Sequence, residues 1–161
     1  MIPQKIKPYF KLTSQKIDGE NSLFAGELTC CDSHGFEVAV IGKIKHHIFS
    51  KMYLCPDNDI IALEVRCRKC GKVIRVFDSC CDGYEQCTNH QYVYRSAKHI
   101  VCKKCQSNNF CVYIKYEYPD LNELEKLEIV ESDNAFTWIW VALECNECGT
   151  RYKNFIDCET T

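Results

Sequence analysis

The sequence of 161 residues contains no run of about 18 apolar residues, the length that a membrane-spanning helix requires. Its beginning, from Met1 to Pro8, has no apolar stretch of the length found in secretion signals. We therefore expect a cytoplasmic protein without a membrane partner. Hydrophobic residues make up 46% and charged residues 26% of the chain, a composition typical of a globular fold.

The motifs of several enzyme classes are also missing. There is no H-E-x2-H metalloprotease motif and no glycine-rich phosphate loop. The segment His99-Ile-Val-Cys102 lacks the glutamate and the preceding proline that zinc deaminases require. Thioredoxin-like enzymes place C-x2-C at the start of a helix, whereas the pairs at 67–70 and 145–148 are followed by glycine and a β-like run. The sequence favours a non-catalytic protein, and a metal-dependent enzyme is the least favoured alternative.

Cysteine, in contrast, is abundant, with 14 residues in the chain. In a reducing compartment, cysteines in C-x2-C pairs are typical of metal ligands rather than of disulfides. Three such pairs occur, at Cys67 and Cys70, at Cys102 and Cys105, and at Cys145 and Cys148. Zinc takes four tetrahedral ligands and is held in structural sites mainly by thiolates. The sequence therefore predicts about two structural Zn2+ ions.

The sequence around these pairs repeats. Alternating apolar residues precede the pairs at 67–70 and 145–148, and a second β-like run that ends on a phenylalanine follows each of them. Upstream, Cys31 and Cys105 are each followed after five residues by a phenylalanine and an alternating run. Period-two alternation indicates strands with one buried face. Each unit thus has the order knuckle, strand, connection, strand, knuckle, strand, which is the order of a zinc ribbon.

We therefore predict a mostly β protein with two tandem zinc ribbons. The predicted parts are an N-terminal extension (1–26), a first ribbon (27–79), a linker (80–99) and a second ribbon (100–161). In the connection of the second unit, Leu121, Leu124 and Leu127 have helical spacing after Asp120. A short acidic helix is one interpretation of this connection, and a loop followed by a hairpin is the other.

The C-x2-C spacing predicts all four ligands of the second site, which are Cys102, Cys105, Cys145 and Cys148. The first site has Cys67 and Cys70, with Cys31 placed by the repeat, and its fourth ligand is Cys30 or His34. Side chains of adjacent residues diverge in extended backbone, which favours His34, whereas the five-residue spacing to the phenylalanine favours Cys30. The choice stays open, and so does loss of metal from this site.

A third, less favoured site would use a cluster near the predicted linker. Its candidate ligands are Cys80, Cys81, Cys87 and His90. No predicted strands flank this segment to hold a knuckle.

Charge is distributed unevenly along the chain. Residues 1–115 carry 17 Lys and Arg against 11 Asp and Glu, whereas residues 116–161 carry 3 against 11. This asymmetry fits either a nucleic-acid face beside an acidic face or two oppositely charged surfaces in contact. Aromatic residues that could stack on bases are Tyr92, Tyr94, Tyr113, Tyr116, Trp138 and Trp140. The pI near 6.2 is lower than in typical basic DNA-binding domains, so we favour a protein partner, with nucleic acid as the alternative.

The segment Cys67-Arg-Lys-Cys-Gly-Lys-Val-Ile-Arg-Val-Phe-Asp-Ser79, continued by Asp82-Gly-Tyr84, resembles a group of bacterial zinc-ribbon proteins. These proteins have a C-x2-C-G-K knuckle, an apolar strand and a Phe-Asp-Ser…Gly-Tyr segment. The resemblance covers about a third of the chain, and the chain departs from it at Cys80-Cys81 and at Cys30-Cys31. It implies zinc ribbons and supplies no activity.

Overall fold

The computed structural model describes residues 1–47, 51–83, 97–120 and 132–160. The mostly β composition predicted from the sequence is confirmed over these ranges, where strands alternate with turns and two short 3-10 turns, η1 (Lys7–Tyr9) and η2 (Ser132–Asn134). The helix considered for residues 121–131 lies outside the described residues. No helix within the described ranges has the length and apolar character to cross a bilayer.

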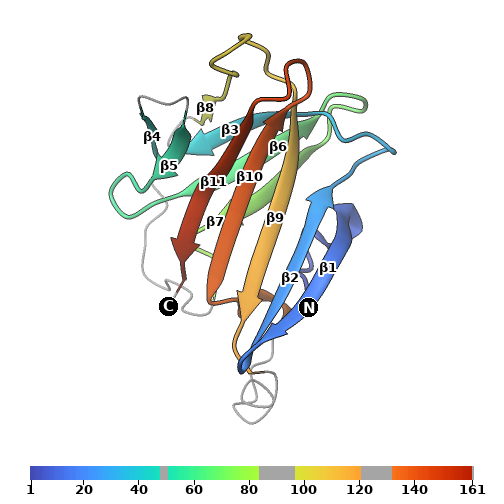
Figure 1. Cartoon of the computed structure of the whole chain (residues 1–161), viewed down its shortest axis with the longest axis vertical. Coiled ribbons are helices and arrows are strands. Elements are labelled where there is room, and N and C mark those ends of the chain that lie inside the picture. Colours follow the sequence, from blue (N-terminus) through green and yellow to red (C-terminus); the bar gives the residue numbers. More distant parts are fainter. Residues whose placement is uncertain (48–50, 84–96, 121–131, 161) are drawn as a thin grey trace.

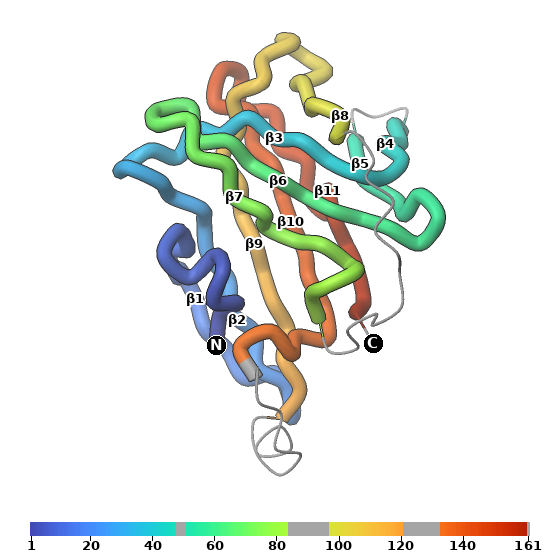
Figure 2. The backbone as a smooth tube through the Cα atoms, turned by 180° about the vertical axis from the view of Figure 1, so that it is seen from behind, coloured from blue at the N-terminus to red at the C-terminus, as the bar shows by residue number. Residues whose placement is uncertain are grey.

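One antiparallel sheet curls over so that it forms two crossed layers (Figures 1 and 2). The first layer runs in the order β1 (Phe10–Asp18), β2 (Asn21–Leu28), β9 (Phe110–Tyr118), β10 (Trp138–Cys145) and β11 (Arg151–Glu159). The second layer comprises β8 (Lys98–His99), β3 (Phe36–Ile41), β6 (Ala62–Cys67) and β7 (Val73–Asp78). A separate hairpin of β4 (Lys43–His46) and β5 (Met52–Cys55) lies beside β8 and β11.

The core lies between the two layers and is built from the alternating residues that the sequence shows. In β10 the residues Ile139, Val141 and Leu143 are fully buried, and in β6 so are Leu63 and Val65. In β10 every neighbour of these residues is more exposed, and in β6 so are Glu64 and Arg66, as the period of two requires, whereas Ala62 at the start of β6 is buried as well. Burial of these side chains supplies the main favourable contribution to folding.

The strands of the two predicted units belong to one sheet and not to two separate ones. The layers are joined where Phe36 of β3 pairs with Phe110 of β9, and these two residues occupy equivalent places in the repeat. Both rings are fully buried. Two equivalent residues that face each other in an antiparallel pair indicate a two-fold relation between the units.

The strand that precedes each unit pairs with the other unit. β2 precedes the first unit but pairs with β9 of the second, with Gly26 opposite Ile114. β8 precedes the second unit but pairs with β3 of the first, with Lys98 opposite Val40. These two pairs are equivalent in register, since Gly26 and Lys98 each lie four residues before a cysteine that opens a knuckle. Each unit therefore completes its sheet with a strand supplied by its partner unit.

This exchange explains how the predicted flanking segments are used. The boundary expected at residue 26 falls within β2, which is hydrogen-bonded to β1 and to β9. The expected linker 80–99 contains β8 at its end. An edge strand without such a partner would expose its backbone N–H and C=O groups.

Candidate metal centres

The three C-x2-C turns share one backbone geometry. In each, the first cysteine donates its N–H to the carbonyl oxygen five residues later, at 2.9, 2.7 and 2.9 Å for Cys67, Cys102 and Cys145. Its own carbonyl oxygen accepts an N–H from the residue after the second cysteine, at 2.8 Å in all three turns. That residue has φ of 75° at Gly71, 69° at Gly149 and 63° at Gln106. Glycine adopts this left-handed conformation without strain, and Gln106 shows that the turn accepts a side chain there.

The second cluster brings together all four of its predicted ligands. The Sγ atoms of Cys102, Cys105, Cys145 and Cys148 lie within 4.8 Å of one another. The Sγ–Sγ distance is 3.5 Å from Cys102 to Cys148 and 3.5 Å from Cys105 to Cys145. Four tetrahedral bonds of about 2.3 Å to zinc would set the sulfurs about 3.8 Å apart. The cluster therefore has the size that a tetrahedral thiolate site needs.

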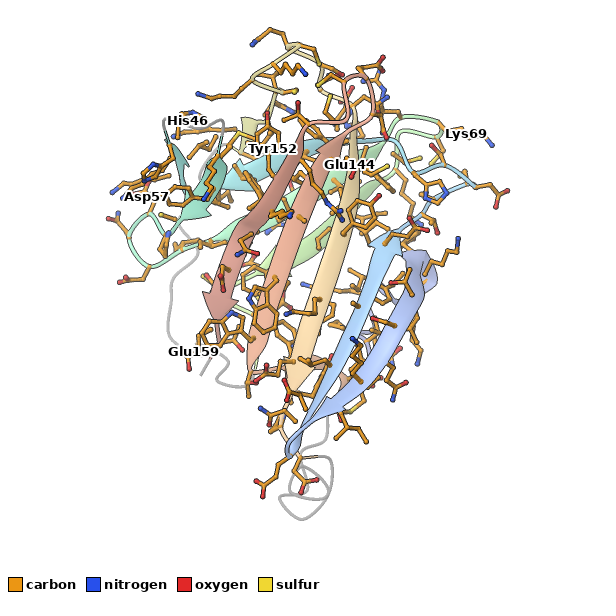
Figure 3. All side chains as sticks on the ribbon, in the orientation of Figure 1. His46, Asp57, Lys69, Glu144, Tyr152 and Glu159 are labelled. Carbon is orange, nitrogen blue, oxygen red and sulfur yellow. The ribbon has the colours of Figure 1, made fainter. Side chains whose placement is uncertain are left out.

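Two hydroxyl groups contact sulfurs of the second cluster. The Tyr152 hydroxyl lies 3.5 Å from Cys102 Sγ and accepts the backbone N–H of Lys103 at 2.9 Å. The Thr150 hydroxyl lies 3.1 Å from Cys148 Sγ. Tyr152 lies at the knuckle end of β11, with Glu159 at the opposite end (Figure 3). The contact with Tyr152 lowers the Cys102 pKa, which is the effect of a hydroxyl that donates to a thiolate.

The charge state of Cys102 follows from these contacts. Burial opposes ionisation, but hydrogen bonds from the Tyr152 hydroxyl and from the backbone N–H groups of Cys105 and Lys104 outweigh it and lower the Cys102 pKa to about 6. Burial, with the hydrogen bond to Cys102, raises the pKa of Tyr152 to about 12. A thiolate stabilised by donors of this kind is the form that binds a metal ion.

The first cluster groups three cysteines, with a fourth beside them. The Sγ atoms of Cys30, Cys31 and Cys70 lie within 4.8 Å of one another. The Cys30 sulfur is 3.8 Å from that of Cys31 and 3.6 Å from that of Cys70. Cys67 is fully buried at the edge of this group, with its sulfur 3.6 Å from the Cys30 carbonyl oxygen. The three grouped cysteines could hold a metal ion, and Cys67 lies next to them as a candidate fourth ligand.

A tighter turn explains how two adjacent cysteines reach one point. Cys31 and Asp32 both have positive φ, 53° and 57°. Cys30 and Ser33 exchange backbone hydrogen bonds of 3.0 and 2.9 Å across them. Two consecutive left-handed residues define a type I′ turn, so the rule that adjacent side chains diverge in extended backbone does not apply here.

His34, the alternative fourth ligand, lies away from the sulfurs. Its Nδ1 atom is 3.6 Å from Glu27 Oε2, and it is not part of the group of close metal-ligating atoms. Of the two alternatives, the structure thus places Cys30 with the cluster and His34 with a carboxylate.

The surroundings of the first cluster differ from those of the second. Lys72 and Ile74 occupy the places of Thr150 and Tyr152, since each follows its knuckle at the same spacing. Burial, followed by the neighbouring thiols of Cys70 and Cys67, raises the pKa of Cys30 to about 12. The Lys72 backbone N–H, followed by the Cys31 thiol, lowers the pKa of Cys70 to about 7. The first cluster thus has backbone donors but lacks the two hydroxyl donors.

The remaining predicted residues are distributed as follows. Cys87 and His90 of the third candidate site lie outside the described residues, so only Cys80 and Cys81 of that set can be placed, after β7. Cys111 faces outward on β9 and donates to Asn146 Oδ1 at 2.9 Å. The hydroxyl groups of Tyr152 and Thr150 are not marked as functional by the sequence. Only their spacing could have indicated them, because Thr150 and Tyr152 lie two and four residues after Cys148, the last cysteine of a knuckle.

The candidate stacking residues lie on two different faces. Tyr116 is fully buried, and Tyr92 and Tyr94 lie outside the described residues. Trp138, Trp140 and Tyr113 are half-buried on the outer face of the first layer. Their rings already have partners within the protein. Trp138 stacks on Trp140 at 5.5 Å, Lys115 lies over Trp140 at 3.5 Å, and Arg151 lies over Tyr113 at 4.9 Å. Each outer ring therefore already has a neighbour on at least one face.

Comparison with known proteins adds nothing to this geometry, because no protein family, curated protein or solved structure matches the chain.

Proposed function

We propose that this chain is a non-catalytic zinc protein in which two tandem zinc ribbons, completed by exchanged strands, present a surface to a protein partner. The observation that carries the proposal is the second cluster, where four thiols lie at the spacing of a tetrahedral site. Thiolates in such a set favour zinc among the common divalent ions, and zinc brings no redox chemistry of its own.

The donor sets support a structural role for the metal. A catalytic zinc site keeps three protein ligands and leaves a position open for water or substrate. Among the described residues, only cysteines make up the two clusters, and no histidine or carboxylate joins either group. The second cluster, if closed by its four thiolates, has no position for a reacting water, and in the first cluster Cys67 would be the fourth ligand.

The position of the clusters explains what structural zinc would do. The second cluster joins the turn before β9 to the turn between β10 and β11, and the first cluster joins the turn before β3 to the turn between β6 and β7. Both sets of turns lie toward the same end of the molecule (Figure 1). Each metal ion would thus fix the strand ends of one unit.

A protein partner is favoured over nucleic acid because the outer aromatic rings are engaged within the protein. Stacking of bases needs accessible ring faces, and here Lys115 covers Trp140 while Trp138 stacks against it. The Trp138 indole N–H also donates to Asp157 Oδ1 at 2.7 Å, which adds a carboxylate to this face. A carboxylate beside the rings would repel a phosphate backbone.

Native mass spectrometry of the untagged protein tests the metal assignment. We expect two zinc ions per chain that leave when the protein is denatured. Less than one zinc ion per chain would contradict the proposal. A gel shift at low salt with single-stranded and duplex probes addresses the alternative, because a phosphate-binding face must respond at low salt. We expect no shift.

A further inference from the structure

A pocket of about 380 Å³ lies between the β4–β5 hairpin, β8 and the Cys102–Cys105 knuckle. These elements lie side by side at one end of the molecule in both views (Figures 1 and 2), and His46 is labelled there in Figure 3. The volume falls within the range of pockets that bind small ligands and peptide side chains.

The floor of this pocket is aliphatic. Met52 and Ile100 are 3% and 1% exposed, and Ile44 beside them is half-buried. The Ile100 backbone N–H donates to the Val38 carbonyl oxygen at 2.9 Å, which fixes this wall to the sheet. Methionine in such a floor adapts its shape to different apolar partners.

The rim of the pocket is cationic. His46, His99 and Lys103 line it, and none of its described lining residues is acidic. Lys45, Lys98 and Lys104 lie next to these residues in the chain and are exposed. Within the described ranges, no carboxylate forms an ion pair with Lys45, Lys98, Lys103 or Lys104. Burial, followed by the charge of Lys103, lowers the pKa of His46, so the positive charge of the rim comes from its lysines.

We propose that this pocket binds a segment of a protein partner in which an apolar side chain is flanked by carboxylates. The apolar side chain would fill the aliphatic floor, and the carboxylates would meet the cationic rim. This inference rests on the proposed function and names the chemistry of its partner. A nucleic acid would match the rim but would bring no aliphatic group to the floor.

The pocket also depends on the second metal cluster. Lys103 and Gln106 belong to the knuckle that carries Cys102 and Cys105. The Lys103 backbone N–H donates a hydrogen bond to the Tyr152 hydroxyl, which also contacts the Cys102 sulfur. Zinc in this cluster would therefore fix one wall of the pocket, so binding of the partner requires the metal.

The test uses the full chain after its zinc content has been measured. The probe is a fluorescein-labelled peptide of sequence Glu-Glu-Leu-Phe-Glu-Glu, and its anisotropy is followed at low ionic strength. The control ligands are the same peptide with serine in place of Leu-Phe and a single-stranded oligo(dT). We expect saturable binding of the first peptide, weaker binding of the serine peptide and weaker binding of oligo(dT).

Two matched variants locate the binding. Lys103→Glu should weaken the peptide by about tenfold or more, because it sets a carboxylate against carboxylates. Lys104→Glu makes the same charge change one residue away, outside the pocket lining. The two variants are compared at about 0.15 M salt, where the Debye length is about 8 Å, and Lys104→Glu should then change the affinity by less than about twofold. Circular dichroism and the zinc count show that both variants are folded.

Three results would overturn the inference: no saturable binding of the peptide, equal losses in the two variants, or tighter binding of oligo(dT) than of the peptide. A protein that binds two zinc ions but no peptide would refute the pocket and leave the proposed structural zinc intact. A protein without zinc would refute the proposed function itself.

Discussion

The two cysteine clusters can be compared position by position, because the strands that carry them pair reciprocally. In the second cluster, both turns are C-x2-C knuckles, and hydroxyl groups of Tyr152 and Thr150 contact two of the sulfurs. In the first cluster, one knuckle is shortened to the type I′ turn at Cys31 and Asp32, and Ile74 and Lys72 replace the hydroxyl residues. Two groups of cysteine sulfurs are thus placed in different surroundings.

This difference shows that the backbone turns position the sulfurs, whereas the hydrogen-bond donors around them stabilise their thiolate form. In the first cluster, the type I′ turn sets the sulfurs of Cys30 and Cys31 3.8 Å apart, and the turn between β6 and β7 brings the Cys70 sulfur to 3.6 Å from that of Cys30. Hydrogen-bond donors around a metal site tune its affinity and often change it by about 10- to 100-fold. We therefore expect both clusters to bind zinc and the second cluster to hold it more firmly.

The largest difference is expected from removal of one ligand in each cluster. Cys145→Ser should release the second zinc and lower the melting temperature by about 10–20 °C, since loss of a structural metal costs about 5 kcal/mol or more and a chain of this size loses about 2–4 °C per kcal/mol. This cluster joins the ends of β9, β10 and β11, which are longer than β3, β6 and β7. Thermal unfolding with native mass spectrometry measures both effects.

Cys67→Ser is the matched variant in the first cluster, because Cys67 and Cys145 are both buried and open equivalent knuckles. We expect it to retain the second zinc and to lose less thermal stability than Cys145→Ser. A larger loss in Cys67→Ser would reverse the order that the comparison assigns to the clusters.

Chelation should remove the two ions in sequence. The first cluster should release zinc at least about tenfold faster, because it lacks the hydroxyl donors to its sulfurs. Alkylation after partial chelation, followed by peptide mass mapping, identifies the cluster that opened first. Cys31 and Cys70 are expected to be modified before Cys105 and Cys148. Simultaneous release of both ions would show that the hydroxyl groups contribute nothing to retention.

Tyr152→Phe removes one of those hydroxyl groups and should affect only the second cluster. We expect a loss of about 1 kcal/mol in the free energy of unfolding, and a faster release of the second zinc. Tyr116→Phe is the control, since the Tyr116 hydroxyl is buried and has no hydrogen-bond partner in the described structure. It should leave zinc release unchanged and should not lower the stability, because it removes a buried hydroxyl that has no partner. Equal effects of the two variants would assign the loss to packing.

The smallest effect is expected at His34. His34→Ala removes its contact with Glu27, a pairing near the surface, and should change stability by less than about 1 kcal/mol. The zinc count should stay at two per chain, whereas Cys30→Ser should lose the first zinc. Loss of zinc from His34→Ala would mean that the histidine turns toward the sulfurs when the metal is present.

The local elements of the fold could be predicted because each depends on a short stretch of sequence. Alternation located the buried faces of β6 and β10, and C-x2-C spacing located the second cluster. The exchange of β2 and β8 could not be predicted in the same way. The alternation of a strand shows which face is buried but carries no information about which strand lies beside it.

One detail of each cluster could also not be predicted from the sequence. The position of Cys31 depends on a turn with two left-handed residues. The pair Cys-Asp does not predict such a turn, whereas Asn-Gly would. Tyr152 has the pattern of an ordinary core residue of β11, and only the fold shows that its hydroxyl reaches Cys102. Both features arise from contacts between segments that are distant in the chain.

The most direct test that each unit binds one structural zinc ion is a crystal structure with anomalous scattering measured at the zinc edge. The account predicts two anomalous peaks per chain, each about 2.3 Å from four cysteine sulfurs, with Cys67 completing the first set. A single peak, or a histidine nitrogen in place of a sulfur at either peak, would contradict it.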